Sequence, residues 1–174
     1  MTRLFSCVFL LLLLLVPVTP SGASSVRSWP DRQWGSKDGE KDGETGGAVR
    51  TAQSFLSARG YKVVIDGVFG RQTEAALKKF QRDHHLVQTG ETNTPTWEAL
   101  VMPIHRGSTG PTVAAAQFLL NQAGYAIAQN GVFGPEMQAD VKKYQAQTGH
   151  TADGLIGSYT WCELVGGNAD EQGD

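Results

Sequence analysis

The chain contains an internal repeat, and this repeat limits what the chain can fold into. A shift of 64 residues aligns residues 49–101 with residues 113–165 without a gap. The motif Gly-Val-Phe-Gly stands at 67–70 in the first copy and at 131–134 in the second. A repeat of this length indicates two copies of one structural unit, each too small to bury much surface alone. We therefore expect two small modules rather than one larger domain.

Each copy has the sequence pattern of three short helices joined by glycine turns. Apolar residues recur every three or four positions in the first segment of both copies, as in an amphipathic helix. Gly60 and Gly124 follow these segments, where a helix end often needs a left-handed residue. The predicted fold class is all-α, with module 1 at residues 48–104 and module 2 at residues 105–166. The aromatic residues expected in the core, in preference to sugar-stacking positions, are Phe69, Trp97, Phe133 and Trp161.

Residues 1–23 have the pattern of a signal peptide. Arg3 supplies a positive charge before an apolar run that contains leucine at every position from 10 to 15, and small residues at 21–23 suit a cleavage site. The apolar run of about 15 residues is shorter than the ~20 that a membrane-spanning helix needs. Cys7 precedes the leucines, whereas a lipid-anchored cysteine would stand at the cleavage site. We therefore expect export, without a stable membrane anchor after signal cleavage.

The modules are expected to lie between two unstructured segments. Residues 24–47 are rich in Gly, Ser, Lys, Asp and Glu and show no periodicity, which predicts a disordered, flexible linker. Residues 167–174 predict a disordered acidic tail. Trp29 and Trp34 are unusual in such a linker, and they could either stack on a sugar or surface or dock onto the folded modules.

Composition and cysteine content narrow the classes of function. The formal net charge is −2 and both signs are mixed along the chain, so the clustered basic face that nucleic acids require is missing. Removal of the signal peptide would leave Cys162 as the only cysteine, which excludes an intramolecular disulfide. Cys162 could pair between chains or act as a nucleophile, but a small, semi-buried residue is the commoner case. Its alignment with Glu98 predicts a position on the outer face of its helix.

Several motifs of the first copy occur in a fixed order. They are a Gln-x-x-Leu pattern on the first helix, then Asp66-Gly67-Val68-Phe69-Gly70, Thr73, Lys79-Phe80-Gln81 and Thr96-Trp97-x-x-Leu100. With the glycine-rich sequence Gly107-Ser108-Thr109-Gly110 before the second copy, this combination resembles the peptidoglycan-binding domain found beside many cell-wall hydrolases. The resemblance covers both repeats.

The resemblance implies a helical module that attaches an exported protein to cell-wall peptidoglycan. The expected location is therefore extracellular and cell-wall associated. Asn130, Pro135 and Met137 of the second copy replace Asp66, Arg71 and Thr73 of the first. We expect the second copy to keep the fold and to bind less well than the first. Two tethered weak sites would gain avidity on a polymer.

Candidate ligand-binding residues flank the Gly-Val-Phe-Gly loop, where a groove could form. The carboxylate of Asp66 could hold a sugar hydroxyl, although a role in capping its own loop is favoured. The loop glycines are expected to supply positive φ or a close backbone approach. The candidate ligand contacts are Tyr61, Asp66, Arg71, Gln72, Tyr125 and Asn130, and the turn glycines are Gly67, Gly70, Gly131 and Gly134.

An enzyme is not favoured by the residues. The acidic residues of the modules are scattered on faces expected to be exposed, whereas a glycosidase needs two carboxylates across one bond. The adjacent His84 and His85, with His105 and His150, lack the ligand spacing of a zinc peptidase. We therefore predict a non-catalytic protein with no metal and no cofactor. The alternative is an interaction or targeting subunit for a protein partner such as a separate cell-wall hydrolase, and a hydrolase itself is the least favoured reading.

Overall fold

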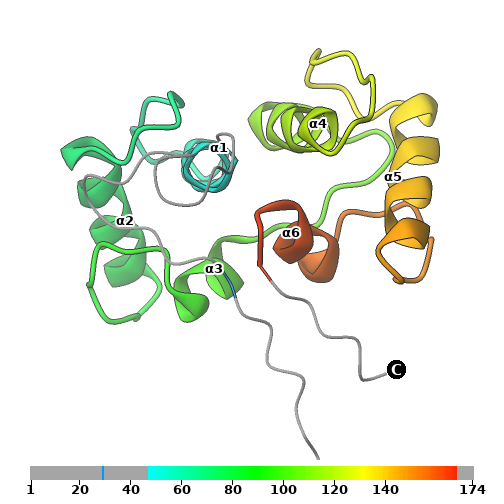
Figure 1. Cartoon of the computed structure of the whole chain (residues 1–174). Coiled ribbons are helices and arrows are strands. Elements are labelled where there is room, and N and C mark those ends of the chain that lie inside the picture. The colour runs from blue at the N-terminus through cyan, green and yellow to red at the C-terminus, as the bar shows by residue number, and fades with distance from the viewer. Residues whose placement is uncertain (1–28, 30–46, 168–174) are drawn as a thin grey trace, which may run out of the picture.

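The computed structural model describes Trp29 and residues 47–167, and this part of the chain contains six helices (Figure 1). Their bounds are α1 Ala48–Ala58, α2 Arg71–Asp83, α3 Thr94–Leu100, α4 Pro111–Gln122, α5 Pro135–Gln147 and α6 Ser158–Leu164. Extended pairing in the described residues is limited to two isolated bridges, Ile104 with Ile156 and Thr109 with Val132. The predicted all-α fold of two three-helix units is confirmed. The predicted signal peptide, most of the linker, Trp34 and the end of the tail lie outside the described residues.

Local sequence explains where these helices begin and end. Gly60 and Gly124 follow α1 and α4 with φ of 82° and 94°, as the sequence predicts. An L side chain is strained in this left-handed region, so glycine ends both helices at the same point of the repeat. At the start of α3 the side chain of Asn93 accepts a hydrogen bond from the Thr96 backbone N–H, which caps the helix.

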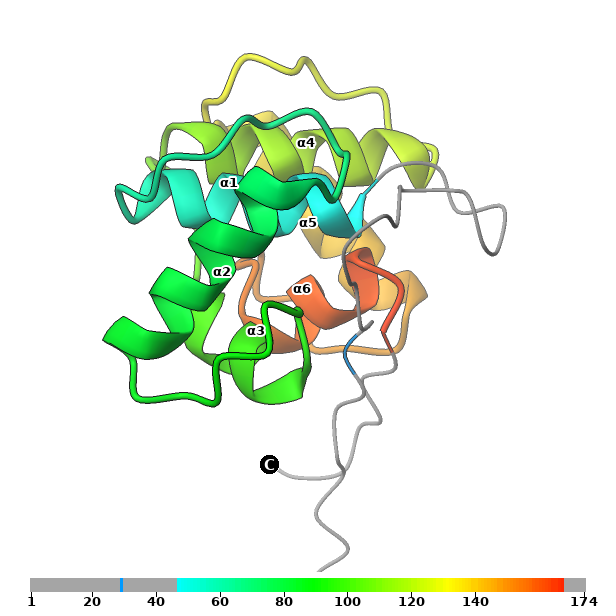
Figure 2. The same ribbon diagram turned by 90° about the vertical axis from the view of Figure 1, so that its left-hand side faces the viewer.

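The two modules pack against each other through their first helices. Helices α1 and α4 lie side by side, while α2 and α5 stand on opposite flanks and α3 and α6 lie below (Figures 1 and 2). Phe55 of α1 contacts Trp161 of α6 edge to face, with ring centroids 5.0 Å apart. The Trp161 indole N–H also donates to the carbonyl of Met102 at 3.0 Å. The two repeats therefore share one continuous core rather than forming two separate ones.

The aromatic residues that the sequence places inside are buried. Trp97, Trp161 and Phe69 are fully buried, and Phe133 is 1% exposed. Trp29, which falls in the predicted disordered linker, belongs to the same core. Its ring is 4% exposed and stacks on Trp97. Of the two alternatives for Trp29, docking onto the folded modules is the one observed.

Cys162 corrects a sequence prediction. Its alignment with Glu98 suggests an outward position, and Glu98 is indeed exposed. Cys162 is instead fully buried in the shared core. An apolar thiol can occupy a buried helix position that would be costly for a carboxylate. The burial also keeps this thiol away from solvent, which removes the access that a nucleophile needs.

Candidate functional site

A buried glutamine holds the loop that follows the first helix of each module. In module 1 the amide of Gln53 donates to the Asp66 carboxylate at 2.8 Å, to the Val68 carbonyl at 3.0 Å and to the Thr73 hydroxyl at 3.1 Å. Its carbonyl oxygen accepts from the Gly67 N–H at 2.8 Å. One fully buried side chain thus fixes both the loop and the first turn of α2. The sequence repeat matches this glutamine but assigns it no structural role.

The same arrangement recurs at the second copy and at the next loop. Gln117 donates to Asn130 and to the Val132 carbonyl, and accepts from the Gly131 N–H at 2.8 Å. Gln81 and Gln145 hold the loops before α3 and α6 through Gly90 and Gly154 in the same manner. We call these four side chains, Gln53, Gln81, Gln117 and Gln145, the glutamine clamps. Because all four side chains are buried, the packing of the core fixes the shape of these loops.

Asp66 and Asn130 serve first as loop caps. In each copy a side-chain oxygen accepts from the backbone N–H two residues later, Val68 or Val132, at 2.9 Å. This bond and the Gln53 amide lower the pKa of the Asp66 carboxyl. Both residues are exposed. The favoured capping role is thus observed, and a ligand contact for either residue stays a prediction.

The four turn glycines do not share one role. Gly67 and Gly131 have φ of 77° and 67°, as the sequence predicts for a tight loop. Gly70 and Gly134 have φ of −100° and −87°, and a Cβ added at either would meet nothing within 4 Å. The expectation of positive φ or close approach is therefore wrong for this second pair. Gly70 and Gly134 stand at the N-caps of α2 and α5, in a conformation open to other residues.

Module 2 has a groove between the loop held by Gln117 and helix α5. Its volume is about 540 Å³. The polar lining comes from Gln117, Asn130, Glu136, Asp140 and Lys143, and the apolar lining from Ala126, Ile127, Ala128, Val132, Pro135, Met137 and Ala139. We call this the α5 groove. It combines hydrogen-bonding groups with an apolar wall, as sites for polar organic ligands do.

The repeat identifies the matching surface of module 1, along the loop 61–70 and helix α2. There Lys62 replaces Ala126, Arg71 replaces Pro135 and Ala76 replaces Asp140. Arg71 and Gln72 are exposed in the first turn of α2, next to the loop that contains Asp66. The structure thus brings three of the predicted residues of module 1 to one end of α2, and the counterpart Asn130 lines the α5 groove.

The two tyrosines among the predicted ligand contacts, Tyr61 and Tyr125, lie away from the N-terminal ends of α2 and α5. The Tyr61 hydroxyl donates to Asp83 at the last turn of α2, and the Tyr125 hydroxyl donates to Gln147 at the last turn of α5. Helix α2 has 13 residues, so its two ends are separated by roughly 18 Å. Each tyrosine ring packs edge on against a core ring, and burial raises the pKa of both hydroxyls. Tyr61 and Tyr125 thus lie toward the C-terminal ends of α2 and α5, whereas Arg71 and Gln72 stand at the N-terminal end of α2, and a ligand contact for either tyrosine stays a prediction.

Both three-helix units match one known protein family. A family model described as a putative peptidoglycan binding domain matches residues 45–100 and again residues 109–164. Together these matches cover more than half of the chain. The chain belongs to this peptidoglycan-binding domain family. The resemblance drawn from the sequence motifs is confirmed for both copies.

Two relatives show how far the similarity extends. The carboxy-terminal processing protease CtpA of Bacillus subtilis (strain 168) is 32% identical over 66 residues, which is 38% of this chain and 14% of the protease. A peptidoglycan-binding protein from Clostridioides difficile, solved at 2.05 Å in complex with glutamine hydroxamate, is 36% identical over 36% of this chain and 40% of that chain, with a TM-score of 0.36. The chain thus spans a small part of the length of this protease.

Two further features of the peptidoglycan-binding modules concern metals and membranes. Among Trp29 and residues 47–167, His, Cys, Asp and Glu side chains form no group of three that could hold a metal ion. The helices in this part of the chain fall short of the length and apolarity that a membrane span requires.

Proposed function

We propose that this chain is an exported, non-catalytic protein that attaches to bacterial peptidoglycan through both of its modules. The α5 groove of module 2 is the observation that carries the proposal. Glycan strands and their peptides present hydroxyls, amides and apolar faces. The amide, carboxylate and ammonium groups of the groove, beside its apolar wall, are complementary to such a ligand.

The arrangement of the two copies supports binding to one polymer at two points. Loops 61–70 and 125–134 both lie at the top of the molecule in two views at right angles, on the same side of α1 and α4 (Figures 1 and 2). Two sites on one chain can engage a repeating polymer together, and the second contact then forms at high effective concentration. Weak single sites thereby suffice for stable attachment.

Sedimentation with purified wall sacculi tests this proposal. Ala139 is exposed on α5 and lines the α5 groove, so Ala139→Arg places a long side chain in it. Ala75→Arg makes the same change at the matching position of module 1. We expect each variant to reduce the bound fraction, and the double variant to remain in the supernatant.

Ala146→Arg is the matched control, because Ala146 is exposed on α5, outside the residues that line the α5 groove, and corresponds to Arg82 of module 1. It should sediment as the unmodified protein does. Equal sedimentation of the double variant and this control would refute the groove as the wall-binding site. The non-catalytic part of the proposal requires that sacculi release no soluble fragments on long incubation with the protein.

A further inference from the structure

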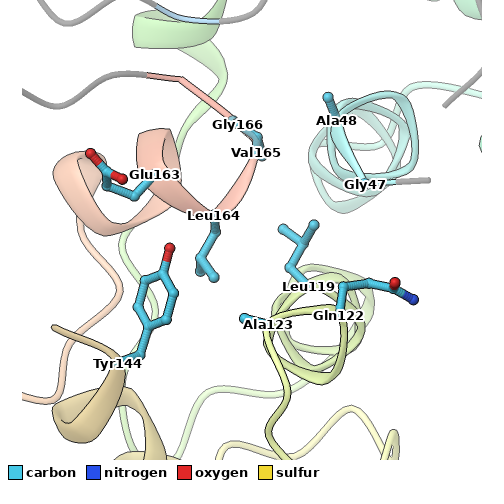
Figure 3. Close-up of a pocket in the computed structure, with 10 residues that line it drawn as sticks. All are labelled: Gly47, Ala48, Leu119, Gln122, Ala123, Tyr144, Glu163, Leu164, Val165 and Gly166. Carbon is cyan, nitrogen blue, oxygen red and sulfur yellow. The ribbon is translucent and has the colours of Figure 1, made fainter. Parts of the chain in front are cut away.

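The α5 groove differs in its lining from a second, smaller pocket of the molecule. That pocket, of about 280 Å³, lies among helices α1, α4, α5 and α6, and the ring of Tyr144 forms part of its lining (Figure 3). None of the residues that line the α5 groove is aromatic. Sugar rings are commonly held against the face of an aromatic side chain. The α5 groove therefore lacks the group that best suits a glycan.

The loop that forms one wall of the α5 groove is held from one side by Asn121 of α4. The N–H of Ile127 donates to the Asn121 side chain at 2.7 Å, and the C=O of Ile127 accepts from it at 2.8 Å. In an extended chain both backbone groups of one residue point to the same side, and those of its two neighbours point to the opposite side. Here the two neighbours are Ala126 and Ala128, and both line the groove.

These two alanines present backbone groups that a bound chain can use. The C=O of Ala128 accepts from the Asn130 N–H at 3.0 Å. Among the described residues, the N–H and C=O of Ala126 and the N–H of Ala128 make no hydrogen bond. Both residues are exposed, and their small side chains allow another chain to approach closely. An open backbone edge of this kind pairs with an extended peptide in β-strand addition.

The side chain of Asn130 adds a donor beside this edge. Its Oδ1 atom accepts from the Gln117 amide and from the Val132 N–H, both at 2.9 Å. Within the part of the chain that the structure describes, its NH₂ group donates no hydrogen bond. Asn130 is exposed and lines the groove, so this group can donate to a carbonyl of a bound chain.

The charged side chains of the lining largely cancel. The Lys143 ammonium lies 2.8 Å from the Asp140 carboxylate, which leaves Glu136 as the only other charged residue of the lining. The apolar part of the lining is aliphatic throughout. At about 540 Å³ the groove falls within the usual range of ligand sites, so it has room for a short segment of chain. A short peptide with small, uncharged side chains therefore fits it.

Module 1 does not repeat this arrangement at the matching positions. Lys62 and Val64 replace the two alanines of the edge, so larger side chains stand there. Asp66 replaces Asn130, and an ionised carboxylate has no hydrogen to donate. The inference therefore concerns module 2 alone.

We propose that the α5 groove binds the peptide part of peptidoglycan rather than the glycan strand. The peptide lies extended and pairs with the backbone of Ala126 and Ala128, while the Asn130 NH₂ group donates to one of its carbonyls. This inference rests on the proposed function, because it names the part of the wall polymer that module 2 recognises.

Amidase digestion of purified sacculi separates the two candidate ligands, because it yields free stem peptides and glycan strands without peptides. Each fraction is titrated into the isotope-labelled protein and followed by NMR. The peptides should give saturable shifts of the Ala126 and Ala128 amide signals and slow the hydrogen exchange of these two N–H groups. The glycan strands should do neither. Glycan strands that bind as tightly as the peptides, or tighter, would overturn the inference.

Sedimentation with intact sacculi, measured in parallel, separates failure of this inference from failure of the proposed function. If the protein sediments with sacculi but the stem peptides give no saturable shifts, peptide recognition by the α5 groove is wrong and wall binding stands. If the protein does not sediment with sacculi, the proposed function itself fails.

Asn130→Asp tests the side-chain donor. The new carboxylate should keep the loop bonds, since Asp66 accepts from the Val68 N–H and the Gln53 amide in module 1. It cannot donate to a peptide carbonyl, so peptide binding should weaken by about tenfold while the melting temperature changes little.

Gln129→Glu is the matched control for this variant. It makes the same change from amide to carboxylate at the neighbouring residue, which is exposed and outside the lining of the α5 groove. Peptide binding should be unchanged. Equal affinities of the Asn130→Asp variant and this control would contradict the Asn130 contact.

The groove-filling variant gives an independent check. Ala139→Arg should abolish the peptide-induced shifts of Ala126 and Ala128, because its side chain occupies the α5 groove. Ala146→Arg, with the same added charge outside the lining, should keep them. Retained shifts in a folded Ala139→Arg variant would place the peptide elsewhere and overturn the inference.

Discussion

Trp29 stacks on Trp97 with ring centroids 5.4 Å apart and an interplanar angle of 17°. The two residues are far apart in sequence, and Trp29 belongs to a segment whose composition resembles a disordered linker. Both rings are nearly or fully buried. One tryptophan of this segment is therefore part of the shared core, whatever the composition of its neighbours.

Removal of either ring should destabilise the protein, and the two losses should be coupled. Trp97→Ala is expected to lower the free energy of unfolding by roughly 3 to 5 kcal/mol through the cavity it leaves. Trp29→Ala should cost at least about 1 kcal/mol, with a coupling energy of about 0.5 to 1.5 kcal/mol between the two. A double-mutant cycle measured by urea denaturation gives both the single losses and the coupling energy. Val87→Ala, at a side chain that is 80% exposed, is the control and should change stability by less than about 0.5 kcal/mol.

The glutamine clamps predict a large effect from a small polar substitution. Gln53→Ala leaves the backbone N–H groups of Asp66 and Gly67 without their acceptor and opens a cavity. We expect a loss of roughly 3 kcal/mol in the free energy of unfolding, since each buried donor left unpaired costs about 1 to 3 kcal/mol. Gln72→Ala, at an exposed position on α2, should stay within about 0.5 kcal/mol of the unmodified protein. Comparable small losses for both would show that the clamp is not important.

Two glycines of the same loop should respond differently to alanine. Gly131→Ala places a Cβ on a residue with φ of 67°, 3.4 Å from the Gly110 carbonyl oxygen. The strain should cost about 1 to 2 kcal/mol in thermal or urea unfolding. Gly134→Ala faces open space at φ of −87° and should cost about 0.5 kcal/mol, from a poorer N-cap alone. The opposite order would contradict the backbone geometry of the loop.

Asp66 predicts a pH dependence that one substitution should reduce. The Val68 N–H and the Gln53 amide lower its pKa below the ordinary 3.8. As the pH falls, the unfolded chain therefore takes up this proton at a higher pH than the folded protein does. The ionised Asp66 stabilises the fold above pH 3.8, and this stabilisation is lost as the pH falls through the pKa of the folded state. Asp66→Asn introduces the residue type that the second copy has at position 130. Because Asn130 accepts a hydrogen bond from the Val132 N–H, the variant should keep the matching bond to Val68 while it removes the charge. Melting temperatures measured from about pH 5 to about pH 2 should fall less steeply for this variant. An unchanged slope would contradict the prediction.

The sequence predicted some parts of the candidate site better than others. Asp66 and Asn130 were predictable as loop caps because an Asx turn depends on residues that are neighbours in the chain. The separation of Tyr61 from Arg71 was not predictable, because it depends on how the loop returns to the far end of α2. The role of Gln53 was equally hidden, since its partners stand 13 to 20 residues away.

The sequence by itself determined the fold class, the two copies, the family and the aromatic core, because these follow from spacing that each copy carries locally. Only the tertiary structure decided that α1 packs on α4, that Trp29 completes the core and that Cys162 is buried. The physical reason is that the repeat specifies which side chain stands at each position, whereas burial and pocket shape depend on neighbours that only the packing of both modules brings together.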